Sequence, residues 1–527
     1  MPLNILIKNI TVVDGSGEPG FIADVGVEQD RISLIGQAQA TTADKTIEGQ
    51  GKVLCPGFVD IHSHSDYYLL INPQGESKLR QGVTTEVGGN CGYSAAPIGG
   101  KILAERQRQY QENYSLDLDW QSLSQYRKRL EDSRIAINYA PLIGHNTIRA
   151  TVMGVENREP TFQELSQMEQ LVEQGMRDGA LGISSGLVYP PACYAKAAEL
   201  VSLCRIVARY GGIFTCHIRN EGTRLTEALT EVIGIAESAP IPLQISHLKT
   251  SGSLNWKKLP QALELIEQAQ NRGVQITADR YPYLASNAGL QVLLPDWAFE
   301  GGVTVQLNRL QDHAVRKRLT EEIILNHPDE EYWDKVLISQ VNSAKNQHWA
   351  GMTVAEASCL QDKTPVDFVL DLLIQEKMQV EAIFFTMNED NLHTILKRPY
   401  VLIGSDASVR AHYGPLNQGK PHPRAFGTFP RVLGHYVRQE GILKLEEAVH
   451  KMTAAPCRKL GLNRRGLIRQ DFAADLVIFD PARITDTATY QEPVQYPLGI
   501  EYVIVNGAIA LACGEPTGLR AGRVLGT

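Results

Sequence analysis

The two ends of the chain alternate apolar and polar positions in short runs separated by turn-forming residues. Residues 3–54 contain such runs around Ile5, Val12 and Val25, and Gly15 and Gly17 mark a turn between them. The C-terminal end repeats this pattern in ADLVIFD (474–480) and GIEYVIVNG (499–507). Short alternating runs indicate antiparallel strands with one buried face. We therefore expect residues 1–57 and 461–527 to form one small β-sandwich from both termini.

The middle of the chain alternates short apolar runs with helical patterns, which is typical of repeated βα units. The apolar runs lie at 58–61, 82–92, 136–145, 180–189, 212–217, 242–247, 274–283 and 400–406. One helix between them has capping-box spacing at Thr161 and Glu164 and a natural stop at Gly179. The pattern predicts an α/β fold, a (β/α)8 TIM-like barrel over residues 58–460. Residues 284–380 are too long for one crossover and predict an insertion after the seventh barrel strand.

Six side chains with metal-ligand chemistry follow five of these predicted strands. They are His62 and His64 after the first strand, Cys91 after the second, His217 after the fifth, His247 after the sixth and Asp406 after the eighth. Alternate side chains of a strand share a face, and residues at the C-terminal ends of barrel strands meet on one side of the barrel. Thiolate and imidazole ligands suit zinc. Each residue alone could be a core side chain or a helix cap, but the joint pattern favours a metal site.

Composition and charge narrow the class of protein. With 43% hydrophobic and 21% charged residues and a net charge of −8, the chain has the character of a soluble globular protein and not of a binder of nucleic acid or anionic membranes. It has no signal-peptide pattern, and no apolar run approaches the roughly 20 residues that span a bilayer. The eight cysteines form no CxxC pair, which fits a reducing compartment. We expect a cytoplasmic protein with a small-molecule partner.

The sequence resembles a known family at motifs spread over nearly the whole chain. The motifs VDIHSHSD, GNCGYS, HIRNE, SHLK, GSDA and PHPRAFGTFPRVLGHYVR are similar to those of the N-acyl-D-amino-acid deacylases (D-aminoacylases) of the metal-dependent amidohydrolase superfamily. The resemblance implies zinc-dependent cleavage of the amide bond of N-acyl-D-amino acids. Many superfamily members bridge two metals with a lysine after the fourth strand, but that strand here ends in ISSGLVY. The resemblance therefore implies one tight zinc ion at Cys91, His217 and His247, and a second, weaker or empty position at His62, His64 and Asp406.

Other polar residues on the same rim suggest catalytic and substrate-binding roles. Asp406 would act as general base and then general acid, and Tyr189 could donate to the developing oxyanion, although a packing role for this tyrosine is as good an alternative. The resemblance places Arg424 at the substrate carboxylate, assisted by Lys249 and Tyr283. An arginine fork matches a carboxylate in a bidentate fashion. An ordinary surface ion pair is the alternative for the cationic residues.

The segment 284–302 is the expected roof of the side-chain pocket. It contains no lysine, arginine or histidine, and its apolar residues are Leu290, Val292, Leu293, Leu294, Trp297 and Phe299. We therefore expect a preference for apolar D-amino acids, unless these residues only dock the insertion. Two other functions remain open: a cyclic amidohydrolase of the dihydroorotase or hydantoinase kind, and a catalytically inactive scaffold.

Overall fold

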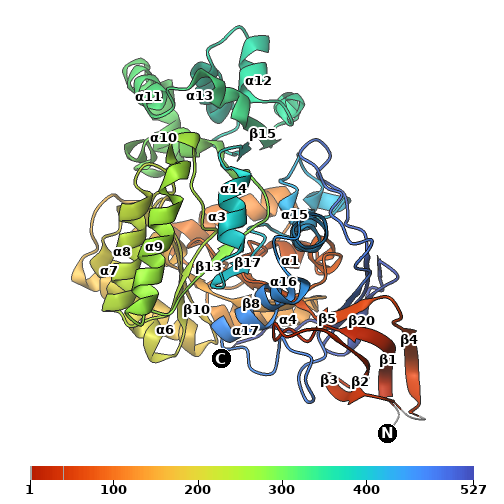
Figure 1. The fold of residues 1–527 in the computed structure, drawn as a ribbon. Helices are drawn as coiled ribbons and strands as arrows, with labels where there is room; N and C mark the ends of the chain where they lie inside the picture. The colour runs from red at the N-terminus through yellow and green to blue at the C-terminus, as the bar shows by residue number, and fades with distance from the viewer. Residues whose placement is uncertain (1–2, 39–40, 527) are drawn as a thin grey trace.

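The computed structural model describes residues 3–38 and 41–526. At its centre, strands of the described residues run parallel around a barrel, as the alternation of apolar runs and helices predicts (Figure 1). The barrel strands are β6 (Phe58–Asp60), β7 (Val83–Gly88), β8 (Asn138–Pro141) continued by β9 (Ile143–Gly144), β10 (Gly182–Gly186), β11 (Ile213–His217), β12 (Leu243–Ile245), β13 (Ile276–Arg280) and β17 (Val401–Ile403).

Backbone hydrogen bonds close the ring of strands. Strands β6, β7 and β8 form one parallel sheet, and β9, β10, β11, β12, β13 and β17 form another in that order. Leu142 joins the two sheets, because it lies between β8 and β9 and its N–H donates to Gly88 O at 3.0 Å. On the other side, Ser63 pairs with Ala407 in a parallel bridge, and His64 N–H donates to Ala407 O at 3.3 Å. The structure is therefore the expected (β/α)8 barrel.

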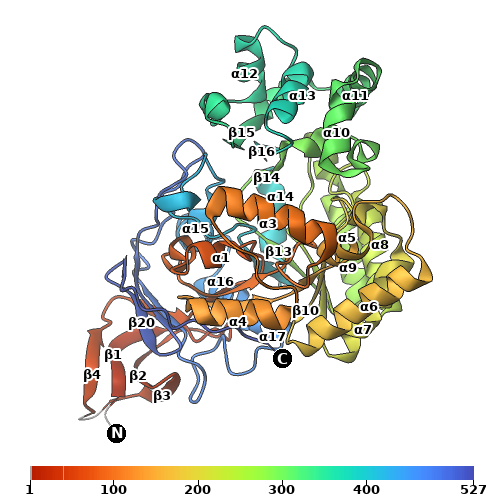
Figure 2. The same cartoon turned by 180° about the vertical axis from the view of Figure 1, so that it is seen from behind.

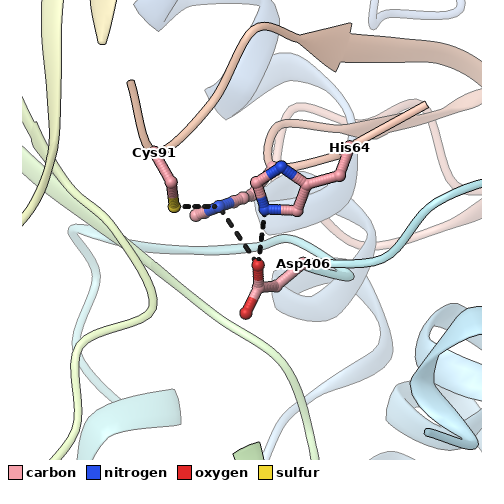
Figure 3. A group of neighbouring side chains, drawn as sticks. His64, Cys91 and Asp406 are labelled. Atoms are coloured by element: carbon pink, nitrogen blue, oxygen red, sulfur yellow. Dashed lines mark hydrogen bonds and ion pairs between the residues drawn. The ribbon is translucent and has the colours of Figure 1, made fainter. Parts of the chain in front are cut away.

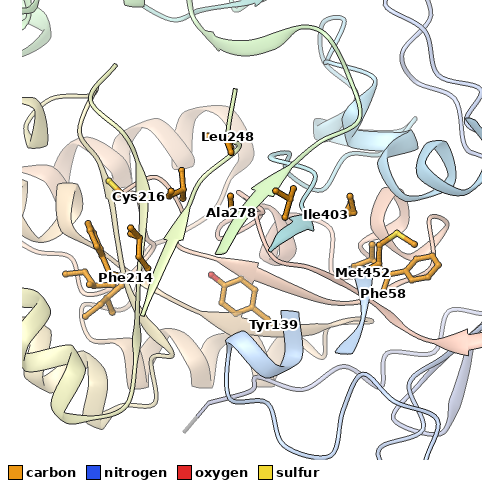
Figure 4. Close-up of a cluster of buried hydrophobic side chains, with 14 of the residues drawn as sticks. Phe58, Tyr139, Phe214, Cys216, Leu248, Ala278, Ile403 and Met452 are labelled. Carbon is orange, nitrogen blue, oxygen red and sulfur yellow. The ribbon is translucent and has the colours of Figure 1, made fainter. Parts of the chain in front are cut away.

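The two faces of strand β17 are buried in different cores. In β17, Val401 and Ile403 belong to the large core between the strands and the surrounding helices, whereas Leu402 belongs to a smaller cluster with Cys457 and Leu460. Alternate side chains of a strand point to opposite faces, so Leu402 points into the barrel. Figure 4 shows part of the large core, including Ile403 and Met452. Apolar residues on both faces explain why this strand has a continuous apolar run.

Helices surround the barrel, as the two opposite views show (Figure 1, Figure 2). Thr161 caps α6 in the predicted capping box with Glu164, and Gly179 follows the helix with φ +95°. Within the described residues, no helix is long and apolar enough to cross a bilayer. The helices around the barrel are α1 (Tyr68–Ile71), α2 (Glu76–Leu79), α3 (Gly100–Tyr114), α4 (Leu123–Ser133), α5 (His145–Met153), α6 (Phe162–Arg177), α7 (Ala197–Arg209), α8 (Leu225–Ser238), α9 (Leu259–Asn271), α14 (Glu389–Leu396), α15 (Arg424–Arg431), the π-helix η8 (Val432–Gln439), α16 (Leu445–Met452) and α17 (Ala454–Lys459).

The chain between β13 and α14 forms the predicted insertion, which has a sheet and a core of its own. Strands β14 (Ser286–Gly289), β16 (Val380–Phe384) and β15 (Val336–Val341) are paired in that order. The helices α10 (Gly302–Gln311), α11 (His313–Asn326), α12 (Val354–Leu360) and α13 (Pro365–Gln375) pack around a separate hydrophobic cluster. Both views show these helices at the end of the molecule opposite the N-terminal strands (Figure 1, Figure 2).

Strands from both ends of the chain pair with one another, as the alternating pattern predicts. They are β1 (Leu3–Val12), β2 (Phe21–Glu28), β3 (Arg31–Gly36), β4 (Ala43–Glu48), β5 (Val53–Pro56), β18 (Leu476–Phe479), β19 (Ile500–Val505), β20 (Ala508–Ala512) and β21 (Glu515–Pro516). The link between the two ends is the antiparallel pairing of β5 with β18, and the strands belong to one hydrogen-bonded sheet around a core of its own. The domain boundaries at residues 57 and 461 stay predictions.

Candidate metal centre

The six predicted metal ligands converge at the C-terminal ends of the barrel strands. Cys91 is at the centre of the group: its Sγ lies 3.3 Å from His62 Nε2, 3.8 Å from His217 Nδ1 and 3.8 Å from His247 Nε2. His247 Nε2 also lies 3.0 Å from His217 Nδ1. The ligand atoms of Cys91, His217 and His247 therefore form one compact set within 4.8 Å of one another.

Asp406 completes a second set that shares the same cysteine. His64 Nε2 lies 2.9 Å and His62 Nε2 3.3 Å from Asp406 Oδ1 (Figure 3). The ligand atoms of His62, His64, Cys91 and Asp406 also lie within 4.8 Å of one another. The structure thus brings all six residues together, and Cys91 belongs to both groups.

The backbone is held in an unfavourable conformation at three of these residues. Cys91, His247 and Asp406 have φ angles of +50°, +35° and +51°, in the left-handed region that non-glycine residues rarely adopt. Each such residue costs roughly 1–3 kcal/mol, which surrounding contacts must offset. The loop of Cys91 packs closely against the end of β10. A Cβ at Gly186, where β10 ends, would lie only 2.3 Å from Cys91 O. The fourth strand therefore presents backbone, and not a bridging side chain, to the loop of Cys91.

The donor set fits a zinc ion. Zinc binds thiolate at about 2.3 Å and imidazole at about 2.0–2.1 Å, so two ligands of one tetrahedral ion lie roughly 3.3–3.6 Å apart. The separations of 3.0–3.8 Å among Cys91, His217 and His247 span this range. Burial by itself would raise the pKa of the Cys91 thiol, but His62, His217 and His247 outweigh it and hold that pKa well below its ordinary value. The cysteine is thereby poised as a thiolate.

Two acidic residues contact the imidazole nitrogens that face away from Cys91. Asp279, in β13, accepts from His62 Nδ1 at 2.9 Å and from His247 N–H at 2.8 Å. Glu221 Oε1 lies 2.9 Å from His247 Nδ1 and also accepts from Lys249. A carboxylate on one ring nitrogen fixes the tautomer that leaves the other nitrogen free for a metal. His62 and His247 accordingly present Nε2 to Cys91.

Three of the other predicted site residues lie beside these ligands, and one contacts different partners. Arg424 Nη1 lies 2.8 Å from Asp406 Oδ2, Lys249 contacts His247, and the Tyr189 ring lies 5.0 Å from the His217 ring. Tyr283 instead donates its hydroxyl to Asp486 at 3.4 Å and packs against Arg431. The role of Tyr283 at the substrate carboxylate stays a prediction.

Sequence reasoning assigned no role to Asp279 or Glu221. Both were visible as polar residues at strand ends, Asp279 within ITADRYPY and Glu221 within HIRNE. Their position at the end of β13 and after β11 was the available signal. What the sequence could not show is that their oxygens point at the rear nitrogens of His62 and His247 and not at the substrate.

Replacing Asp279 by asparagine should weaken zinc binding roughly 10–100-fold, because the carboxylate that orients His62 and raises its basicity is lost. Zinc affinity is measured by competition with a chelator of known affinity. The matched control is Asp475→Asn, which removes another buried carboxylate, paired with Arg465 in the terminal sheet. Equal zinc affinity in the Asp279→Asn variant and the unmodified protein would contradict the supporting role.

Comparison with known proteins places this metal centre in a family. Residues 45–511 match the model of the amidohydrolase family. The D-aminoacylase of Alcaligenes xylosoxydans xylosoxydans is 36% identical over 99% of this chain and 98% of its own length. The crystal structure of N-acyl-D-glutamate deacylase from Bordetella bronchiseptica, complexed with zinc and a phosphonate inhibitor, is 31% identical with a TM-score of 0.85, and a structure of D-aminoacylase described as having a binuclear metal centre is 36% identical with a TM-score of 0.84. Each of these two matches covers 100% of this chain and 100% of the chain in the solved structure. The chain belongs to the amidohydrolase family and, within it, to the N-acyl-D-amino-acid deacylases.

Proposed function

We propose that this protein is a zinc-dependent hydrolase that cleaves the amide bond of N-acyl-D-amino acids and releases a carboxylate and a free D-amino acid. The observation that carries the proposal is the grouping of Cys91, His217 and His247 directly beside the Asp406–Arg424 pair. This arrangement combines a zinc ligand set, a general base and a cation for a substrate carboxylate at one barrel face. Membership of the deacylase family supports the D configuration of the substrate.

Asp406 is the residue best placed to move protons. A zinc ion bound here would polarise the amide carbonyl and lower the pKa of water to about 7. Burial by itself would raise the pKa of Asp406, but Arg424, His62 and His247 outweigh it and hold that pKa well below its ordinary value. Asp406 is therefore ionised before the reaction, and its Oδ1 can accept a proton from water and return it to the departing nitrogen.

Arg424 is the proposed partner of the substrate carboxylate. It is 4% exposed and its guanidinium lies 4.6 Å from the centre of the Tyr281 ring. Although Arg424 Nη1 is close to Asp406, the contact lies outside hydrogen-bond geometry, and this atom has no hydrogen-bond partner within the described residues. A buried donor without a partner costs about 1–3 kcal/mol, which a bound carboxylate would recover. Lys249 contacts His247, and its Nζ lies 6.0 Å from the centre of the same Tyr281 ring, so it is the second cation of the site.

The proposed preference for an apolar side chain rests on Glu381 and not on the leucines of segment 284–302. Leu290, Leu293 and Leu294 are buried in the core of the insertion, so they dock this element and do not roof a pocket. The insertion instead carries Glu381, in β16, within range of the charges of His64 and Arg424. Burial outweighs the nearby charges of Arg410, Arg424 and His64 and raises the pKa of Glu381. A carboxylate beside the substrate would disfavour D-glutamate and D-aspartate derivatives and leaves uncharged D-amino acids as the proposed substrates.

The proposal is tested by measuring amine release from matched N-acetyl-D- and N-acetyl-L-amino acids in the presence of zinc. We expect release from the D-methionine and D-leucine derivatives, none from their L forms, and a lower kcat/KM for N-acetyl-D-glutamate. A higher kcat/KM for D-glutamate would refute the apolar preference alone. If no derivative is hydrolysed by zinc-loaded protein, the deacylase proposal fails, and cyclic amides become the next substrates to test.

The variant Glu381→Gln isolates the contribution of the insertion. It keeps the size of the side chain and its hydrogen bond with Asn287 but removes the charge. We expect the ratio of kcat/KM for N-acetyl-D-glutamate to that for N-acetyl-D-methionine to rise several-fold. An unchanged ratio would show that Glu381 does not face the substrate side chain.

A further inference from the structure

A second cluster of metal-binding side chains lies outside the catalytic centre, between helix α14 and the π-helix η8. Glu389 begins α14, His435 lies in η8, and Glu440 follows η8 directly. One ligand atom from each of these three residues lies within 4.8 Å of the other two. All three side chains are partly open to solvent, with exposed fractions of 36%, 28% and 28%. An ion could therefore reach the cluster from solution.

The π-helix explains why His435 and Glu440 meet. In an ordinary α-helix with 3.6 residues per turn, side chains five positions apart point about 140° away from each other. Here Glu440 N–H donates to His435 O at 2.9 Å, the i→i+5 bond of a π-turn, and His435 Nε2 lies 3.0 Å from Glu440 Oε1. π-Helical turns are rare in proteins, and those that do occur are frequently found at functional sites. The π-turn therefore brings the side chains of His435 and Glu440 together.

Hydrogen bonds behind the cluster fix the orientation of its donors. His435 Nδ1 lies 2.9 Å from the side-chain oxygen of Gln439, so Nδ1 carries the proton and Nε2 faces Glu440. Tyr436 donates its hydroxyl to Glu389 Oε1 at 2.7 Å. Metal-binding histidines generally donate their second nitrogen to a carbonyl or carboxylate, and ligating carboxylates are in turn hydrogen-bonded. Both supporting contacts are present here.

His393 adds a fourth donor next to the two carboxylates. Its Nε2 lies 2.8 Å from Glu440 Oε2 and 3.2 Å from Glu389 Oε1. This nitrogen is shielded from solvent, yet within the described residues neither contact satisfies hydrogen-bond geometry. The 2.8 Å separation is shorter than the roughly 3.3–3.6 Å between two ligands of one tetrahedral zinc ion, so His393 would move away from Glu440 when an ion binds. The missing hydrogen bond leaves this nitrogen free for such an ion.

We propose that Glu389, His435, Glu440 and His393 bind a divalent transition-metal ion, with zinc as the best match, at a site separate from the catalytic centre. Two imidazoles and two carboxylates form a ligand set of the type that zinc accepts. The ion would link α14, which precedes the last barrel strand, to the π-helix that follows Arg431. Such a link would stabilise this side of the barrel without contributing ligands to catalysis.

The test is the zinc content of the full-length protein after equilibrium dialysis at zinc concentrations well above those that fill the catalytic centre. The unmodified protein is compared with the His393→Gln/His435→Gln double variant, and with the single variant Glu440→Gln in case the double variant does not fold. His313→Gln removes another exposed histidine, in the insertion, and is the matched control. We expect about one zinc ion fewer per chain in both cluster variants, and no change in the control.

Chemical modification gives a second readout at single residues. Diethylpyrocarbonate reacts with accessible imidazoles, so zinc should slow the modification of His435 several-fold and leave that of His313 unchanged. Deacylase activity should be equal in all four proteins. Neither zinc content nor histidine modification depends on this activity, so a failure of the proposed catalytic function would not affect the result. Equal zinc content in every variant, together with no protection of His435, would overturn the second site and leave only ion pairs between histidine and glutamate.

Discussion

Replacing Cys91 by alanine should remove the tightly bound zinc and lower kcat/KM roughly 1,000-fold or more. Residues that merely support metal ligands already contribute 10–100-fold, and Cys91 is the one ligand that both groups share. Its loss would remove the thiolate around which His62, His217 and His247 converge. The measurements are zinc content per chain and kcat/KM on the best N-acetyl-D-amino acid.

Cys204→Ala is the matched control, because this buried cysteine differs from Cys91 in its surroundings and not in its accessibility. Burial raises the pKa of Cys204, which keeps it a neutral thiol, whereas three imidazoles hold the pKa of Cys91 low. The control variant should keep its zinc and its activity and lose only packing energy. If Cys91→Ala retained both zinc and activity, the ligand assignment would be wrong.

The position of the metal centre follows from local sequence, because each ligand ends a recognisable strand. His62 and His64 come directly after an apolar run, and the other four ligands follow other runs of the same kind. The barrel geometry then brings strand ends together, whatever lies between them. Local patterns likewise predicted the cap of α6 at Thr161, because capping depends on residues only three positions apart.

Contacts between distant segments were not predictable in the same way. Leu290, Leu293 and Leu294 indicated a pocket roof, but they are buried in the core of the insertion. The proposed role of Glu381 depends on the pairing of β16 between β14 and β15. The partner of Tyr283 is Asp486, which lies 203 positions along the chain. A single sequence gives the polarity of such residues but not the residue that each one contacts.

Lys78 is a buried cation at the junction of the first and last barrel strands. Lys78 is fully buried, and its Nζ donates to Asp60 Oδ2 at 2.6 Å, to Ser405 Oγ at 2.6 Å and to Ala407 O at 2.8 Å. These bonds join β6 to the residues on both sides of Asp406. The same ammonium lies 3.8 Å from Glu86. Lys78 therefore holds the first and last barrel strands together at the metal centre.

Lys78→Met should lower the free energy of unfolding by about 3–5 kcal/mol, because removing one partner leaves the buried Asp60 carboxylate without compensation. Denaturant unfolding at fixed zinc concentration measures the loss. Lys128→Met is the matched control: this lysine pairs with Asp132 at 3.0 Å, with side chains 74% and 57% exposed, and should change stability by only about 0.5 kcal/mol or less. A loss of similar size in both variants would show that the buried pair has no special role.

The cost of Lys78→Met should also grow as the pH rises. Burial raises the pKa of Glu86 to about 7, and Lys78 is the strongest of the groups that oppose this shift. A carboxyl group with a raised pKa in the folded state favours folding while it holds its proton, and this contribution is lost as the pH rises through the folded-state pKa. Without Lys78 that pKa rises further, so ionisation of Glu86 above pH 7 becomes more costly. The difference in stability between variant and unmodified protein should therefore be larger at pH 8 than at pH 5. A difference that does not change with pH would mean that Lys78 acts through packing and not through its charge.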